Sequence, residues 1–144
     1  MQQSYRFADV LTHTGATRSQ LIYWTDAELI TPDVADTAGT GHHRAFSFRN
    51  LIQVKIATLL AARGLSVSTI GFILRALRLS PHASRYPEIA WIPTDATTTS
   101  NAVWTGSIAE FPHELRHRMT GGGAIGIVIK LNELVDALRE KTAA

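Results

Sequence analysis

A glycine followed two residues later by a helix-capping sequence constrains the fold of this chain more than any other feature. The apolar spacing of residues 7–11 predicts a short first helix, and Gly15 is suited to end it in a left-handed conformation. Residues 17–20 (TRSQ) then form a capping box, in which the threonine hydroxyl accepts from the glutamine amide and the glutamine side chain reaches back. Two helices joined by so short a turn predict a helix-turn-helix, with the second helix over residues 18–27.

Two further helices are predicted downstream, each with a serine cap. Ser47 caps a helix over residues 48–63, and Ser66 caps a fourth helix that ends before a proline. Between the second and third helices, residues 33–41 form a polar Gly/Ala/Thr loop with the length of a wing. Residues 1–79 therefore predict a four-helix winged helix-turn-helix domain.

The character of the sequence changes after Pro81. Residues 88–93 and 102–108 weakly predict strands, and residues 124–131 (AIGIVIKL) predict a buried strand because they are β-branched and nearly continuous. Asn132 is expected to cap a final amphipathic helix. The fold class is therefore expected to be mainly α, with residues 80–144 forming a small α+β segment. Its apolar face, expected to serve dimerisation or a partner, consists of Leu131, Leu134, Val135 and Leu138.

Composition excludes several classes of protein. A hydrophobic fraction of 45% and a charged fraction of 18% are typical of a globular domain, and the absence of cysteine excludes disulfides and thiolate zinc sites. No apolar run is long enough to cross a bilayer, and the N-terminus has no apolar signal-peptide core. We expect a cytoplasmic protein with no membrane partner and no cofactor.

Charge is unevenly distributed along the chain. Residues 1–78 hold eight Lys/Arg against five Asp/Glu, whereas residues 79–144 hold six against seven. Four of the five N-terminal acids lie between residues 26 and 36, so the other basic residues have no acid close in sequence. The pattern predicts a basic face made from Arg18, Arg44, Arg49 and Lys55.

Seven short motifs follow one another in order over residues 5–78. They are Tyr5-Arg6-Phe7-Ala8-Asp9-Val10, Gly15-Ala16-Thr17, Leu21-Ile22-Tyr23-Trp24, Glu28-Leu29-Ile30-Thr31-Pro32, Gly41-His42-His43-Arg44-Ala45-Phe46-Ser47, Leu51 and Gly64-Leu65-Ser66. This set resembles the DNA-binding domain of the MerR family of bacterial transcription regulators. The resemblance implies a winged helix-turn-helix, usually dimeric, that binds promoter DNA and often distorts it, with RNA polymerase as a further partner.

The sequence departs from that family at two places. The family's recognition helix commonly has an arginine just before its aromatic pair, and here that position is Ile22. Members also usually continue into a long dimerisation helix after the fourth helix, whereas Ser80-Pro81 breaks the chain here.

The candidate DNA contacts lie on the second helix and on the loop. Arg18 and Gln20 occupy the first helical turn, where arginine suits guanine and glutamine suits adenine, although the capping box competes for Gln20. The resemblance implies that Tyr23 presents its hydroxyl to a phosphate. Arg44 on the wing is suited to phosphate or minor-groove contact, the alternative being a solvated loop charge. The expected contact set is Thr17, Arg18, Ser19, Gln20, Tyr23, His42, His43, Arg44 and Arg49.

Two other functions stay open. A phage excisionase or packaging-recognition subunit would have the same fold. Residues 113–117 (HELRH) also match H-E-x-x-H, in which two histidines bind zinc and the glutamate activates water, with Glu133 as a third ligand. Because only Leu115 and Met119 are apolar in that helix, a polar surface helix is the preferred interpretation. The favoured prediction is a sequence-specific DNA-binding transcription regulator that is not an enzyme.

Overall fold

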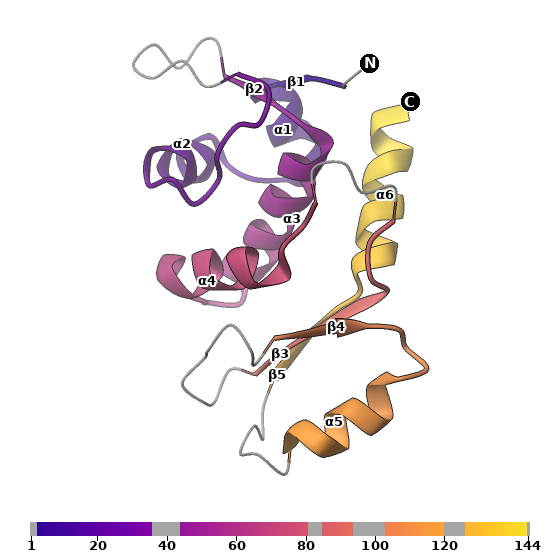
Figure 1. Cartoon of the computed structure of the whole chain (residues 1–144). Helices are drawn as coiled ribbons and strands as arrows, with labels where there is room; N and C mark the ends of the chain where they lie inside the picture. The colour runs from indigo at the N-terminus through magenta and orange to yellow at the C-terminus, as the bar shows by residue number, and fades with distance from the viewer. Residues whose placement is uncertain (1–2, 36–43, 81–84, 94–102, 120–125, 144) are drawn as a thin grey trace.

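The computed structural model describes residues 3–35, 44–80, 85–93, 103–119 and 126–143 (Figure 1). Six helices and two small sheets form this part of the chain, which confirms the predicted mainly α fold with a small α+β C-terminal part. The elements in chain order are β1 (Tyr5–Arg6), α1 (Phe7–Thr14), α2 (Arg18–Asp26), β2 (Ala45–Phe46), α3 (Phe48–Ala62), α4 (Val67–Leu77), β3 (Ile89–Pro93), β4 (Trp104–Gly106), α5 (Phe111–Met119), β5 (Gly126–Ile129) and α6 (Leu131–Ala143).

Local sequence signals set the turn between α1 and α2. The Thr17 hydroxyl accepts from the Gln20 amide at 3.1 Å, and the Gln20 side chain accepts from the Thr17 amide at 3.0 Å. Gly15 ends α1 with a φ of 78°, in the left-handed region where a side chain would be strained. The predicted helix-turn-helix is confirmed, and α2 ends one residue earlier than expected.

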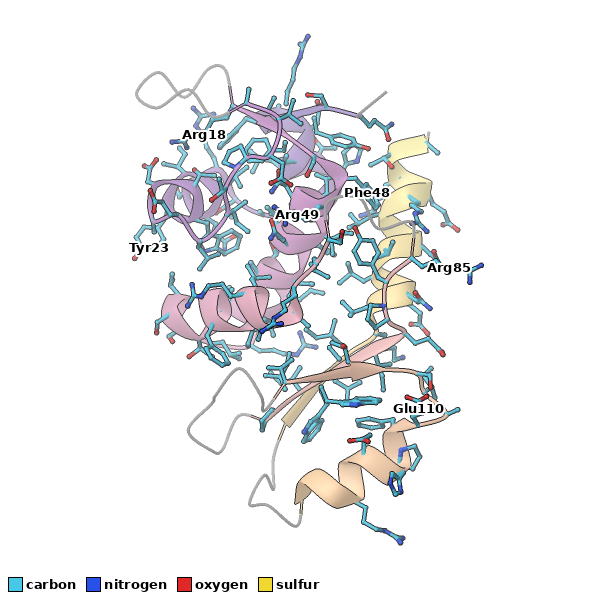
Figure 2. All side chains as sticks on the ribbon, viewed as in Figure 1. Arg18, Tyr23, Phe48, Arg49, Arg85 and Glu110 are labelled. Atoms are coloured by element: carbon cyan, nitrogen blue, oxygen red, sulfur yellow. The ribbon has the colours of Figure 1, made fainter. Side chains whose placement is uncertain are left out.

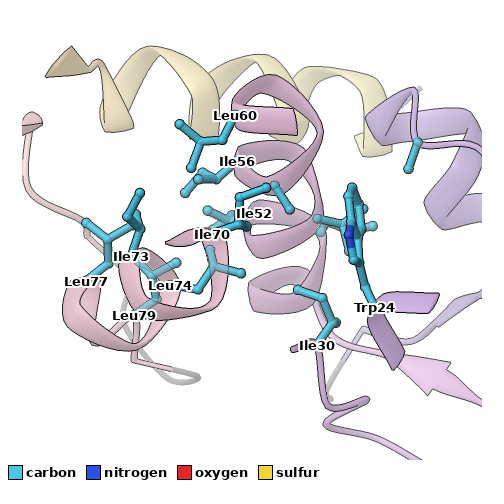
Figure 3. Close-up of a cluster of buried hydrophobic side chains, with 14 of the residues drawn as sticks. Trp24, Ile30, Ile52, Ile56, Leu60, Ile70, Ile73, Leu74, Leu77 and Leu79 are labelled. Carbon is cyan, nitrogen blue, oxygen red and sulfur yellow. The ribbon is translucent and has the colours of Figure 1, made fainter. Parts of the chain in front are cut away.

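Helix α3 is the centre of the hydrophobic core. Its Ser47 cap accepts from the Asn50 amide, and seven of its fifteen residues are buried. Figure 3 shows α3 with Ile52 and Ile56 facing α4, and with Trp24 and Ile30 on its other side. Burial of each large apolar side chain contributes about 1.5–3 kcal/mol, so packing around α3 is the main stabilising force for the N-terminal helices.

A three-stranded antiparallel sheet with the strand order β4-β3-β5 follows α4. One face of β3, with Ala90 and Ile92, joins the main core, while Trp91 packs on the opposite face against Phe111 of α5, with ring centroids 6.0 Å apart. A Cβ on Gly126 would lie 2.3 Å from the Trp91 ring, so β5 can approach that ring only with glycine there.

Two expectations for the C-terminal segment are wrong. The strand β5 is not buried along its length, because Val128 is 43% exposed and β5 lies at the edge of the sheet that the described residues form. Asn132 does not cap the final helix either, since α6 begins at Leu131 and places Asn132 inside the first turn.

Helix α6 packs back onto the N-terminal helices α1 and α3 (Figure 1). Its residues Leu131, Val135 and Leu138 are buried and belong to the same hydrophobic cluster as the apolar side chains of α3. The partner-binding surface expected for these three residues is therefore used inside the chain, and only the half-buried Leu134 of that set reaches the surface. No helix in the described part of the chain has the length and apolar character to cross a membrane.

The shared core predicts that the two halves of the chain unfold together. Leu138→Ala should lower the free energy of unfolding by about 2–4 kcal/mol, because it leaves a cavity next to α1 and α3. We expect one cooperative urea transition, followed by circular dichroism and by tryptophan fluorescence. The matched control on the exposed side of α6 is Glu140→Ala, which should change stability by less than about 0.5 kcal/mol. Two separate transitions, with the first 79 residues unaffected by Leu138→Ala, would contradict the shared core.

Candidate nucleic-acid interface

Helix α2 has one buried face and one exposed face. Leu21 and Trp24 anchor it in the core. Arg18, Ser19 and Tyr23 are exposed, with Tyr23 57% accessible. Figure 2 shows Arg18 and Tyr23 projecting from α2 on the side of the molecule opposite α6. The outer face of α2 is therefore available to a macromolecular partner.

The first turn of α2 carries a positioned arginine. The Arg18 guanidinium lies over the Phe7 ring, 5.4 Å from its centroid. A guanidinium stacked on a ring keeps its in-plane N–H groups for another acceptor. Arg6, which precedes Phe7 in the chain and ends β1, is also exposed. Sequence reasoning missed Arg6 as a candidate contact, because its pairing with Ala45 at the end of the loop is formed only in the folded chain.

Gln20 is committed to the capping box. A bidentate contact with adenine requires the carboxamide oxygen to accept and the carboxamide nitrogen to donate. In the structure that oxygen already accepts from the Thr17 amide at 3.0 Å. Gln20 and Thr17 therefore hold the start of α2 in place, and the geometry favours this capping role over readout of a base.

Arg44 lies against the C-terminal end of α2. Its guanidinium donates to the Thr25 hydroxyl and, at 2.9 Å, to the Asp26 carboxylate. The Arg44 side chain is only 12% exposed. A positive charge at this end of a helix is favourable because the last carbonyl groups carry partial negative charge. The structure gives Arg44 a role inside the protein: it ties the end of the loop to α2.

Arg49 is also engaged within the chain. It binds the Asp33 carboxylate with two hydrogen bonds of 2.6 and 2.9 Å, and its third nitrogen donates to the Leu79 carbonyl at 3.1 Å. The Ser47 hydroxyl donates to the same carboxylate at 2.6 Å. Asp33 thus joins the segment after α2 to the start of α3. The expectation of a basic face that includes Arg44 and Arg49 without nearby acids is wrong, because folding pairs them with Asp26 and Asp33.

Other polar contacts secure the surroundings of this network. The Lys55 ammonium donates to the Thr14 carbonyl at 3.4 Å, so it too is held within the protein. The Tyr86 hydroxyl donates to the Ser80 carbonyl at 3.2 Å. Burial raises the pKa of Tyr86, with Arg139 and Arg49 opposing that shift, so the phenol stays neutral and keeps its proton for this bond.

The loop between α2 and α3 begins and ends at a paired stem. Ala35 and Ala45 exchange backbone hydrogen bonds of 2.7 and 3.1 Å, and β2 pairs with β1 beside them. Arg6 lies opposite Ala45 in this pairing, so it is beside the place where the described chain resumes after the loop. His42 and His43, which the sequence analysis predicts as DNA contacts, lie outside the described residues.

The H-E-x-x-H sequence lies on α5, where His113 is exposed and the side chain of His117 is outside the described set. Within the described part of the chain, no three His, Asp or Glu side chains gather in a way that could hold a metal ion.

Comparison with known proteins agrees with the helix-turn-helix. No family model matches the chain. Over 74 residues the sequence is 32% identical to uncharacterized HTH-type transcriptional regulators of Mycobacterium bovis and Mycobacterium tuberculosis. The matched stretch is 51% of this chain and 33% of each relative, so the chain covers a third of the length of the relatives that it matches.

The ion pair between Arg49 and Asp33 predicts a loss of stability on mutation. Arg49→Ala should lower the free energy of unfolding by about 2 kcal/mol, because Asp33 keeps a largely buried carboxylate without its cation. Arg49→Lys should recover only part of that loss, since an ammonium cannot bind both carboxylate oxygens with the same geometry. The measurement is urea unfolding, with Arg85→Ala as the exposed control (Figure 2). Unchanged stability would show that the pair contributes nothing to the fold.

Proposed function

We propose that this chain is a sequence-specific DNA-binding transcription regulator whose helix α2 docks in the major groove. The observation that carries the proposal is the exposed outer face of α2, from which Arg18 and Tyr23 project. The opposite face of the helix is buried and anchors it in the core. The similarity to proteins named as HTH-type transcriptional regulators supports it.

In this proposal the residues of α2 divide between bases and backbone. Arg18 is the base-reading residue, since its in-plane donors match O6 and N7 of guanine and the Phe7 ring preorganises the guanidinium. Ser19 and the hydroxyl of Tyr23 contact phosphates, which set the position of the helix in the groove. The first amides of α2 add a favourable field for a phosphate near Thr17.

The loop acts as the wing, and Arg44 holds it in place. With its guanidinium on Thr25 and Asp26, Arg44 fixes the end of the loop to the helix that reads the groove. Arg6 lies beside the same stem, at the β1–β2 pair, and supplies an exposed charge for the phosphate backbone. His42 and His43 of the loop are proposed as additional backbone contacts. Binding as a two-fold dimer would give a pseudo-palindromic site, with RNA polymerase as the further partner at a promoter.

Arg18→Ala tests base readout. We expect affinity for a site enriched from a random oligonucleotide pool to fall by about 5- to 100-fold, corresponding to about 1–3 kcal/mol, with a smaller loss for random DNA. The measurement is fluorescence anisotropy with labelled duplexes. The control is Arg116→Ala, which removes an exposed arginine of α5. Equal losses for both variants, or for both kinds of DNA, would contradict base readout by Arg18.

The salt dependence of DNA affinity distinguishes two roles for Arg44, a direct contact with a phosphate and the positioning of the loop. Arg44→Ala should weaken binding while leaving the slope of log affinity against log salt unchanged, because the side chain already pairs with Asp26. A residue that neutralises one phosphate makes the slope shallower by about 0.9 when it is removed. Arg6→Ala should show that change. A change of this size in Arg44→Ala would instead make Arg44 a phosphate contact.

A further inference from the structure

A groove of about 350 Å³ lies between the second half of α3, the strand β5 and the start of α6. Its lining residues are mostly apolar and include Leu59 and Val128, which are 38% and 43% exposed. Leu134, the one residue of the expected partner face that reaches the surface, also lines it. The groove is on a different part of the molecule from Arg18 and Tyr23. We refer to it as the β5 groove.

The open edge of β5 runs along this groove. In the described part of the chain, β5 pairs with β3 on one side and with no strand on the other. In the register of β3 and β5, Pro93 lies opposite Gly126 and Trp91 lies opposite Val128. Proline has no N–H, so Pro93 and Gly126 are not a hydrogen-bonded pair. Hydrogen-bonded and non-hydrogen-bonded pairs alternate along an antiparallel ladder, so Trp91 and Val128, two residues along, are not a hydrogen-bonded pair either. The backbone N–H and C=O of Val128 therefore point away from β3, toward the open edge.

We propose that the β5 groove is a homodimer interface that takes β5 of a second copy of this chain. The two strands pair antiparallel about a two-fold axis at Val128, and each Val128 N–H donates to the Val128 carbonyl of the other copy. The three strands of each copy then form one continuous six-stranded sheet. On the face toward α3, Ile127 of one copy lies opposite Ile129 of the other, as apolar cross-strand neighbours.

Two features favour a second copy over another partner. An edge strand with β-branched residues is a template for an identical strand, and an isologous interface must be self-complementary. The rim of the groove carries both signs of charge, with Arg63 and Lys130 against Glu133. Lys130 and Glu133 already pair within the chain, with Nζ and Oε2 3.7 Å apart, so the rim has little net charge to favour a strongly acidic or strongly basic partner.

The fold also removes the α6 face as a candidate dimer interface. The apolar face of α6 packs into the core, since Leu131, Val135 and Leu138 are buried within one chain. The β5 groove combines open backbone hydrogen-bonding groups with exposed apolar side chains on a surface separate from α2. The inference rests on the two-fold dimer of the proposed function and names its interface, and its test does not involve DNA, so that failure of the interface is distinguished from failure of DNA binding.

The test is the mass of the protein by sedimentation, with charges placed at the proposed axis. Wild type should be a dimer. Val128→Lys and Val128→Glu should each raise the dimer dissociation constant at least about tenfold, since like charges then lie directly opposite one another. An equimolar mixture of the two variants should form dimers again, because residue 128 then meets the opposite charge. The matched control is Ile108→Lys, at a residue that is 59% exposed outside the groove, and it should remain dimeric.

Folding of each variant is checked by circular dichroism and thermal unfolding. If the Val128 variants do not fold, Leu59→Lys, on a helix that the change leaves intact, should weaken the dimer. A monomeric wild type at every concentration overturns the proposal, as does a dimer that none of these substitutions weakens. A mixture of Val128→Lys and Val128→Glu that stays monomeric overturns the two-fold register. A monomeric wild type that binds a β-branched peptide would assign the groove to another partner's strand and overturn the proposal in the same way.

Discussion

The burial of Trp24 against α3 is the constraint on which the presentation of α2 depends. Together with Leu21 it fixes which side of α2 faces the core (Figure 3), while the Thr17–Gln20 capping box fixes where the helix begins. With the start and the rotation of α2 both set, Arg18 and Tyr23 lie on its outer face. Packing of the opposite face in the core therefore determines which face of α2 is exposed. The proposed reading of DNA uses this exposed face.

Folding redistributes the positive charge of the N-terminal half. Arg44 and Arg49 bind Asp26 and Asp33, so their guanidinium groups organise the loop and the start of α3. The exposed arginines that remain in this half include Arg18 in the first turn of α2 and Arg6 in β1, together with Arg63, Arg75 and Arg78 further along the chain. A chain with a net charge of only +2 can still offer a local positive field, because its acids are used to hold other arginines in place.

Features determined within a few residues were predictable from the sequence, and those determined across the fold were not. The caps at Thr17 and Ser47 and the left-handed Gly15 are local, and the helices begin and end there. The partners of Arg44 and Arg49 lie 18 and 16 residues away along the chain, and no local pattern gives that pairing. The burial of Leu138 and the exposure of Val128 were misjudged for the same reason, since both depend on which elements pack beside α6 and β5.

DNA binding by α2 is tested most directly by titrating the isotopically labelled protein with double-stranded DNA and following the backbone amide resonances. We expect the largest shifts in residues 17–23 and at Arg6 and Ala45, and we expect them to diminish as salt rises. Shifts confined to α5, or to the β5 groove, with those of α2 unchanged, would contradict DNA binding by α2.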